Sequence, residues 1–130
     1  MKMNRTFAAL KLVAGIALLG MGTAADARVL AGGSIYGGTS QTQGTCYLYN
    51  AGTSTVTISS RQIIRESGIN LNPTGCTTLL SNRTCAITMP IVNNRAHACR
   101  FVFTPDSADV RGAFEVRDNN LDILNSIELK

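Results

Sequence analysis

Hydrophobic and polar residues alternate with a period of two along most of the chain after residue 44. The clearest run is 96–104, and runs 84–89 and 110–117 alternate in the same way. A period of two is typical of strands with one buried face, whereas an amphipathic helix repeats every 3.6 residues. No stretch after residue 27 shows a helix-length pattern. The alternation therefore predicts an all-β fold.

Turn-forming residues divide this part of the chain into seven or eight short strands. We expect strands at residues 45–50, 54–59, 62–66, 76–79, 84–89, 96–104, 110–117 and 123–129. This number of strands in about a hundred residues fits an immunoglobulin-like antiparallel β-sandwich. A small β-barrel is the alternative, because strand count alone does not show whether a sheet closes.

The alternation also predicts which side chains point inward. The expected inward positions are His97, Cys99, Phe101 and Phe103, then Val110, Gly112, Phe114 and Val116, and finally Ile123, Asn125, Ile127 and Leu129.

A turn at residues 105–107 would join two of these runs as a hairpin. Phe101 would then face Gly112, and the aromatic ring over the glycine would explain a glycine at a core position. On the outer face, Arg100 would lie diagonal to Glu115 as an exposed ion pair.

The first 27 residues have the pattern of a secretory signal peptide. A basic start (Lys2, Arg5 and Lys11) precedes the apolar run 12–21, and small residues at 25 and 27 form an A-x-A cleavage site. The apolar run is shorter than the roughly 20 residues that span a bilayer, so we expect no membrane association after cleavage. The predicted organisation is a signal peptide at 1–27, an arm rich in Gly, Ser and Thr at 28–44, and a sandwich domain at 45–130. We expect the arm to bury little surface and to contain at most a short strand around residues 34–36.

All four cysteines lie beyond the predicted cleavage site, at Cys46, Cys76, Cys85 and Cys99. An even number of cysteines behind a signal peptide indicates two disulfides in an oxidising compartment, periplasmic or extracellular. Zinc is disfavoured because no C-x-x-C pair exists and the chain has a single histidine. Cys76 and Cys85 would lie opposite each other in a hairpin around residues 80–83, which leaves Cys46 to pair with Cys99. Three connectivities stay formally possible.

Loss of the signal peptide lowers the net charge. The whole chain carries +4, but cleavage removes three of its twelve basic residues and one of its eight acids, leaving +2. A concentrated basic face for nucleic acid is therefore not indicated, and we expect no nucleic-acid partner. The basic residues that remain suggest a possible anion-binding surface, with Arg111 and Arg117 on one face and Arg100 on the neighbouring strand.

Residues that could carry catalysis or hold a cofactor do not form recognisable sets. His97 has no predicted nucleophile or orienting group, and no serine lies in a G-x-S-x-G elbow. The acidic run 118–122 could hold calcium, but it lacks the spacing and the glycine of a calcium loop and is interpreted as a turn. Tyr47 and Tyr49, without any tryptophan, give only weak support for sugar stacking. We therefore expect no catalytic residues, no metal and no cofactor.

Three segments resemble a known type of protein. NAGTSTVTIS (50–59), GCTTLLSNRTCAI (75–87) and the pair ACRFVF (98–103) and DVRGAFEVRD (109–118) are similar to small secreted bacterial immunoglobulin-like β-sandwich proteins of uncharacterised function. The resemblance covers residues 45–129 and departs from the usual pattern at residues 81–82, where Pro-Gly would be normal. It implies a secreted, non-enzymatic domain and supplies no catalytic residues.

Three functions follow as hypotheses. The first is a secreted or periplasmic structural or binding module with an unknown protein or cell-surface partner. The second is a subunit of a surface assembly in which the arm at residues 28–44 adds as a strand to a neighbour. The third is a hydrolase inhibitor or a small hydrolase, supported only by the disulfide-stapled scaffold.

Overall fold

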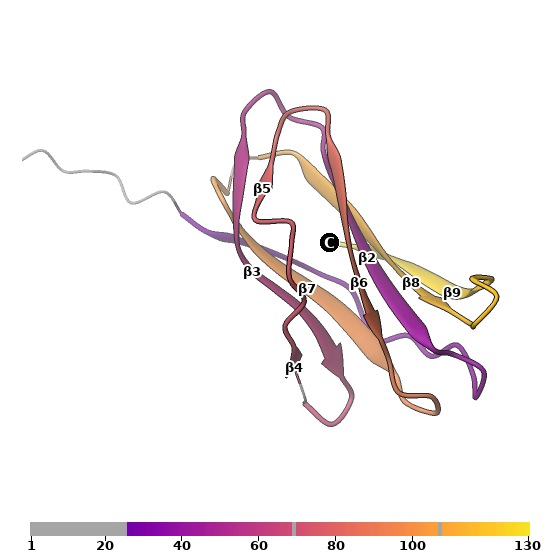
Figure 1. Cartoon of the computed structure of the whole chain (residues 1–130). Helices are drawn as coiled ribbons and strands as arrows, with labels where there is room; N and C mark the ends of the chain where they lie inside the picture. The colour runs from indigo at the N-terminus through magenta and orange to yellow at the C-terminus, as the bar shows by residue number, and fades with distance from the viewer. Residues whose placement is uncertain (1–25, 69, 107) are drawn as a thin grey trace, which may run out of the picture.

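The computed structural model describes residues 26–68, 70–106 and 108–130, and it consists of two antiparallel sheets packed face to face (Figure 1). Sheet A contains β1 (Arg28–Ala31), β3 (Val56–Arg65), β4 (Asn70–Leu71), β5 (Thr78–Leu79) and β7 (His97–Thr104), in the order β1-β7-β3 with β4 and β5 both beside β3. Sheet B contains β2 (Gln43–Asn50), β6 (Thr84–Pro90), β8 (Val110–Arg117) and β9 (Ile123–Leu129), in the order β6-β2-β8-β9.

The all-β prediction is confirmed. The described residues contain no helix, and the nine strands form two separate sheets, not one closed barrel. Most of the predicted signal peptide, residues 1–25, lies outside the described residues. No described helix is long and apolar enough to cross a membrane.

The core lies between the sheets, where the alternation placed it. His97, Cys99, Phe101 and Phe103 are all fully buried on β7, and Phe114 and Val116 are fully buried on β8. These side chains meet Leu48 and Ile87 from the same sheet as β8, and Ile63 and Leu79 from the sheet of β7. Burial of these large apolar side chains supplies the main driving force for folding.

Both predicted hairpins are wrong, for the same topological reason. β7 pairs with β1 and β3, whereas β8 pairs with β2 and β9, so Phe101 does not face Gly112 and Arg100 is not diagonal to Glu115. Likewise β5 pairs with β3 and β6 pairs with β2. The chain therefore crosses from one sheet to the other between β5 and β6 and again between β7 and β8, and neither pair of consecutive strands forms a hairpin.

Two irregularities shift the alternation along the chain. In β3, a shift in pairing with β7 at Ser59 moves the buried positions from Val56 and Ile58 to Ile63. Because β3 accommodates this extra residue, the expected strands 54–59 and 62–66 form one continuous strand. In β9, a similar shift places Ile123 opposite Arg117, where Ile123 is 54% exposed; its expected inward orientation is wrong.

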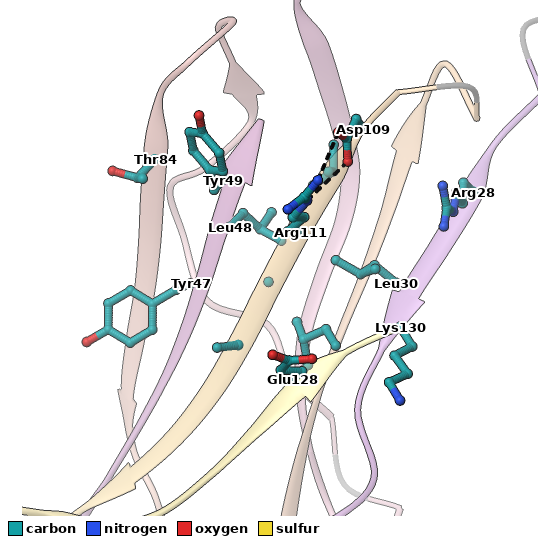
Figure 2. A pocket seen from close by; sticks show the side chains of 14 residues that line it. Arg28, Leu30, Tyr47, Leu48, Tyr49, Thr84, Asp109, Arg111, Glu128 and Lys130 are labelled. Atoms are coloured by element: carbon teal, nitrogen blue, oxygen red, sulfur yellow. Dashed lines mark hydrogen bonds and ion pairs between the residues drawn. The ribbon is translucent and has the colours of Figure 1, made fainter. Parts of the chain in front are cut away.

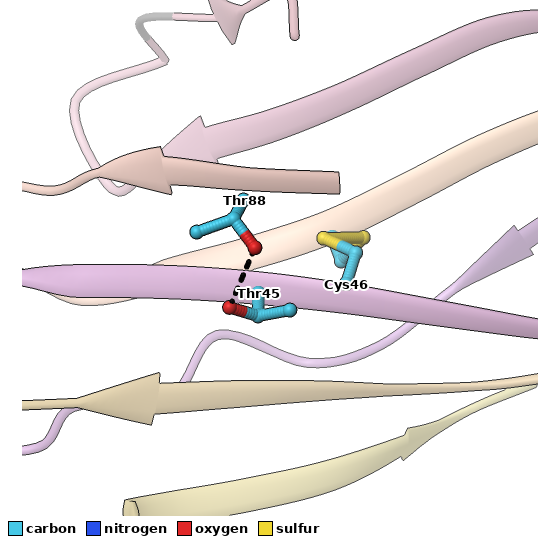
Figure 3. The surroundings of a disulfide bond; sticks show 4 residues. Thr45, Cys46 and Thr88 are labelled. Carbon is cyan, nitrogen blue, oxygen red and sulfur yellow. Dashed lines mark hydrogen bonds between the residues drawn. A yellow bond between two sulfur atoms is a disulfide. The ribbon is translucent and has the colours of Figure 1, made fainter. Parts of the chain in front are cut away.

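Two disulfides join the sheets, and they have the pairing that the sequence favoured. Cys46–Cys99 links β2 with β7, each of which lies in the interior of its sheet, and both cysteines are fully buried. Figure 3 shows this bridge beside a hydrogen bond of 3.0 Å between the hydroxyl groups of Thr45 and Thr88. Cys76–Cys85 links the segment before β5 with the edge strand β6. Its geometry comes from a crossover between sheets, not from the expected hairpin.

The opposite side of the sandwich is held by backbone contacts. Ala31, at the end of β1, and Lys130, directly after β9, donate their N–H groups to each other's carbonyl oxygens, both at 3.0 Å. This reciprocal pair connects sheet A to sheet B at the edge away from Cys76–Cys85. Each side of the sandwich is therefore fastened between the sheets.

The segment 28–44 packs into the sandwich, contrary to the expectation that it buries little surface. Leu30 pairs with Phe101 and is 2% exposed, and Ile35 forms a bridge with His97 and is 8% exposed. Gln41 is fully buried and accepts a hydrogen bond from the N–H of Gly37. The only strand expected here was near residues 34–36, but the main strand is β1.

Candidate functional site

A groove of about 770 Å³ lies at one end of sheet B. It is bounded by β2, β6, β8 and β9 of sheet B and by β1 of sheet A. Figure 2 shows two tyrosines along one side and basic side chains along the other. The groove therefore combines side chains from segments that lie far apart in the sequence.

Tyr47 and Tyr49 form the aromatic side of the groove. They lie two residues apart on β2, so both project from the outer face of sheet B, while Leu48 between them points into the core. The hydroxyl group of Tyr49 donates to Asn82 at 3.3 Å, and that of Tyr47 accepts from Arg117 at 3.2 Å. These bonds hold the rings while leaving aromatic surface beside the groove.

The floor of the groove is low because β8 has small residues there. Gly112 lies between Leu48 and Leu129 in the strand register, and Ala113 lies between Tyr47 and Glu128. A Cβ on Gly112 would lie 2.8 Å from the carbonyl oxygen of Tyr47, so a side chain does not fit at this position without a shift of the backbone. The glycine that the sequence analysis explained by an overlying Phe101 is thus required by close approach of β2 and β9.

The strand pairing beside the groove is incomplete. β2 pairs with β8 as far as Val110, but β9 pairs with β8 only as far as Gly112. Val110 and Arg111 consequently have β2 on one side and no described strand on the other. Lys130, the residue after β9, instead forms backbone hydrogen bonds with Ala31.

Three basic side chains reach the groove from three segments. Arg28 comes from β1, Arg111 from β8, and Lys130 from the residue after β9. Arg111 forms an ion pair with Asp109 at 3.4 Å, with side chains 72% and 54% exposed. Within the described part of the chain, no carboxylate lies within 4.0 Å of a side-chain nitrogen of Arg28 or Lys130. The region is therefore suited to an anionic group.

The proposed surface of Arg100, Arg111 and Arg117 is wrong as a single patch. Arg100 lies on β7 in the other sheet, where it donates to Gln62 at 3.0 Å. Arg111 and Arg117 do share a face of β8, but six residues separate them, which is roughly 20 Å along a strand.

Arg117 belongs to a polar network at the other end of that face. Its guanidinium donates to Glu115 at 2.5 and 3.1 Å, with side chains 23% and 19% exposed. Glu115 raises the pKa of Arg117 by this hydrogen bond. Because its donors are already used by Glu115, Tyr47 and the carbonyl of Leu121, Arg117 holds the sheet surface together and is poorly placed to capture a ligand.

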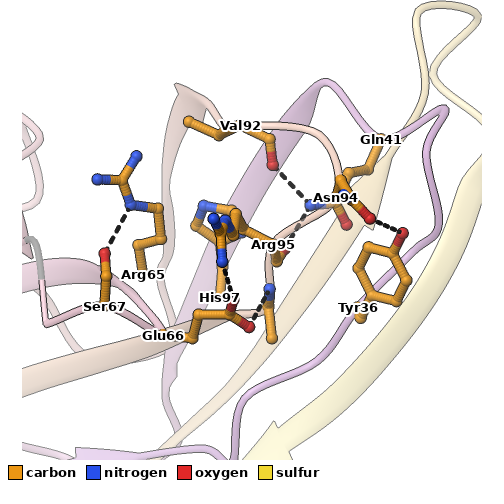
Figure 4. Close-up of polar contacts among 10 residues, drawn as sticks. Tyr36, Gln41, Arg65, Glu66, Ser67, Val92, Asn94, Arg95 and His97 are labelled. Atoms are coloured by element: carbon orange, nitrogen blue, oxygen red, sulfur yellow. Dashed lines mark hydrogen bonds and ion pairs between the residues drawn. The ribbon is translucent and has the colours of Figure 1, made fainter.

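His97 belongs to a second polar region (Figure 4). His97 lies at the start of β7, whereas the groove residue Arg28 pairs with Phe103 near the other end of that strand. It is fully buried, and its Nδ1 lies 2.9 Å from the carbonyl oxygen of Arg95. Since a carbonyl only accepts, Nδ1 carries the proton, and Nε2 is the bare nitrogen with no partner among the described residues. Burial lowers the pKa of His97, and Arg65 lowers it further, against the opposing effects of the Arg95 carbonyl and Glu66. This environment favours the neutral form of the imidazole.

The surroundings of His97 organise loops. The Nε2 amide of buried Gln41 donates to the carbonyls of Val92 (2.8 Å) and Arg95 (2.5 Å). Glu66 accepts from the Arg95 guanidinium at 2.9 Å and from the N–H of Ala96 at 3.1 Å, and these bonds lower its pKa. No nucleophile in the described chain hydrogen-bonds to the imidazole. The arrangement fixes residues 91–96 against the segment 35–42.

The acidic run 118–122 forms a turn, as interpreted from the sequence. One carboxylate oxygen of Asp118 accepts from the N–H groups of Asn120 at 2.8 Å and Asp122 at 3.0 Å. Leu121 adopts a left-handed conformation with φ of 69°. No group of three or more potential metal ligands gathers anywhere in the described ranges.

Most of the groove has no recognisable signal in the sequence. Tyr47, Tyr49 and Arg111 are candidates only as single residues, and Arg28 and Lys130 carry no local signal, because they are brought together only by the lateral pairing of Ala31 with Lys130. Gln41 carries no such signal either, since a single glutamine in a polar segment does not indicate burial.

Comparison of the chain with protein-family models, with curated proteins and with solved structures found no match.

Proposed function

We propose that this chain is an exported, non-enzymatic binding module whose ligand occupies the groove between Tyr47, Tyr49 and the basic side chains of Arg28, Arg111 and Lys130. The observation that carries the proposal is the convergence of these side chains, from β1, β2, β8 and the end of β9, on one concave region of about 770 Å³. Volumes of this size are typical of ligand sites.

Export is supported by the disulfides. Cys46–Cys99 joins strands of the two sheets and Cys76–Cys85 joins the segment before β5 to β6, and such bridges persist in oxidising compartments such as the periplasm or the extracellular space. With the signal-peptide pattern of residues 1–27, this favours a secreted or periplasmic protein of bacterial origin, with no membrane association or nucleic-acid partner after cleavage.

We further propose that the sandwich is of the immunoglobulin-like type found in small secreted bacterial proteins. The support is the position of Cys46–Cys99, which joins an interior strand of one sheet to an interior strand of the other across the core. Immunoglobulin domains have an inter-sheet bridge of this kind.

The first test is expression of the full chain in a bacterium, followed by periplasmic extraction. We expect a mature protein that starts at Arg28 and has no free thiols, as measured by amino-terminal sequencing and thiol titration. Peptide mapping under non-reducing conditions should recover Cys46–Cys99 and Cys76–Cys85. An intact amino terminus together with free thiols would overturn the exported function.

The second test addresses the groove. Ala113→Phe fills the floor of the groove without changing its charge, and Ala98→Phe changes a residue on β7 in the other sheet as a control for surface substitution. A ligand screen followed by backbone amide NMR shifts should give perturbations at the groove of the wild type and of the control, and none in Ala113→Phe. Ligands that perturb only residues elsewhere would refute the groove as the site.

A second candidate function is a subunit of a surface assembly. The favouring observation is that β1 sits at an edge of sheet A, paired only with β7 along its length and with β9 by the single Ala31–Lys130 pair. The same pairing formed with β7 of a second copy would exchange this segment between chains.

Cysteines at two directly opposed positions separate the candidates. Val29 pairs with Val102 across β1 and β7, so Val29→Cys with Val102→Cys would form a bridge wherever that pairing exists. A monomer on a non-reducing gel indicates a segment docked on its own chain, as the binding module requires. A covalent dimer or ladder that grows with protein concentration indicates strand exchange.

A further inference from the structure

We propose that the groove binds an extended, acidic peptide segment that lies beside Val110 and Arg111. This inference rests on the proposed function, because it names the ligand class of the same groove.

The strand edge favours a peptide. β9 stops pairing with β8 at Gly112, and the next two residues of β8, Arg111 and Val110, have no described strand on that side. The N–H of Val110 donates to the carbonyl of Ala108 at 3.0 Å, so this donor is not free for a peptide. Extended peptides bind proteins by adding to such an edge, where the backbone supplies hydrogen bonds and alternate side chains enter pockets. Leu30 of β1 lines the other side of the same groove.

The charges favour acidic side chains on that peptide. Arg28, Arg111 and Lys130 outnumber the two carboxylates of the groove, Asp109 and Glu128. Only the Arg111–Asp109 pair lies within ion-pair distance, and its exposure makes it weak enough for a ligand carboxylate to compete. Arginine is particularly suited to a carboxylate because its donors form a planar fork.

The shape favours a chain with side chains on alternate sides. Gly112 and Ala113 make the floor low between Tyr47 on β2 and Glu128 on β9. Every second side chain of an extended peptide could enter this depression while its neighbours point to solvent. Tyr49, which is 39% exposed, offers an aromatic face to aliphatic parts of the peptide.

The test is a titration of the isotope-labelled mature protein with an acetylated heptapeptide of alternating threonine and glutamate. We expect amide shifts at residues 28–30, 110–113 and 128–130, and an affinity that falls as salt is raised from about 20 to 200 mM. Arg111→Gln should weaken binding about tenfold, the effect of losing roughly 1.4 kcal/mol. Arg95→Gln is the matched control, because Arg95 is also exposed and ion-paired but lies far from the groove, with Glu66 as its partner.

Two further probes make the result decisive. A heptapeptide with glutamine in place of glutamate should bind at least tenfold more weakly, and equal binding would overturn the acidic preference. A trigalacturonate that binds the groove more tightly than the acidic peptide would overturn the peptide proposal and leave the binding module intact. Failure of the acidic peptide to shift any groove amide would overturn this inference alone. The proposed function would fail separately, if the broader ligand screen also found no occupant of the groove.

Discussion

Gly37 lies so close to Val116 that a Cβ on Gly37 would be 2.8 Å from Val116 Cγ1, and it would also be 2.9 Å from Leu124 Cβ. Real Cβ atoms essentially never approach neighbours so closely. The segment between β1 and β2 therefore packs tightly over β8 and β9 at Gly37, although its composition suggests a loose arm.

Gly37→Ala is expected to lower the free energy of unfolding by about 1–3 kcal/mol, since overpacking in a tight site forces backbone shifts. Gly33→Ala is the matched control, because a Cβ there would meet only Ile127 Cδ1, at an ordinary 3.6 Å. Urea unfolding of both variants measures the difference. Equal stability of the two variants would show that the segment yields freely and is not closely packed.

The two disulfides should differ in their contribution to stability. In the chain-entropy model, the Cys46–Cys99 bridge, with a sequence separation of 53, contributes roughly 4 kcal/mol. The Cys76–Cys85 bridge, with a separation of 9, contributes about 2.5 kcal/mol. Replacing each pair by alanines and measuring urea unfolding should show the larger loss for Cys46 and Cys99, which are also fully buried. A larger loss for the other pair would contradict this order.

His97 should make the protein less stable as pH falls. Its pKa is lower in the folded state than its usual 6.5, mainly because of burial, so the unfolded state binds more protons below that value. Stability linked to His97 is therefore complete above about pH 7 and decreases as pH falls below 6.5 toward the folded-state pKa. The measurement is the urea midpoint at several values between about pH 7.5 and 5, and His97→Asn should flatten the slope.

Glu66 provides the control for that experiment. Its pKa is lowered from 4.5, first by the hydrogen bond from Arg95 and then by that from the Ala96 N–H, so its contribution is lost only at lower pH than that of His97. Glu66→Gln should leave the pH dependence of the urea midpoint unchanged between about pH 7 and 5. If Glu66→Gln removed the slope and His97→Asn did not, the assignment to the imidazole would be wrong.

Asn50 should be one of the most sensitive polar positions. It is fully buried; its amide donates to the carbonyls of Ser54 at 2.7 Å and Leu79 at 3.1 Å, and its side-chain oxygen accepts from the N–H of Gly52 at 3.0 Å. Asn50→Ala leaves these three backbone groups without their partner and should cost about 2–4 kcal/mol in urea unfolding.

Asn50→Asp separates hydrogen bonding from side-chain volume. The aspartate has nearly the same shape, but when ionised it faces two carbonyl oxygens and cannot donate to them. Its loss of stability should therefore grow as pH rises above about 4. A loss that does not depend on pH would indicate that the size of the side chain matters more than its donors.

Period-two alternation was sufficient to identify most of the strands and much of the core, although it missed β1 and β4. The buried faces of β7 and β8 follow directly from it, because a half-buried strand places every second side chain on the apolar side. The pairing of Cys46 with Cys99 and of Cys76 with Cys85 was also predicted correctly, although it was inferred from a hairpin that does not form. The acidic run 118–122 was also correctly interpreted as a turn, since Asp and Asn side chains satisfy nearby backbone N–H groups.

Alternation could not show which strand lies beside which. A connection that crosses between sheets and one that folds back as a hairpin have similar turn residues, so β5 with β6 and β7 with β8 were assigned as neighbours wrongly. The shift at Ser59 and the shift that exposes Ile123 were equally invisible, because each depends on the partner strand.

The sequence alone thus determined the class of fold, the strand faces and the cysteine framework, because each depends on residues close together in the chain or on the count of their types. Only the tertiary structure decided the sheet order, the burial of Gln41 and the meeting of Arg28 with Lys130 at the groove. These features arise from packing between segments that are distant in the sequence. The stabilising free energy of such packing depends on both surfaces together, so neither segment shows a periodic pattern that would predict it.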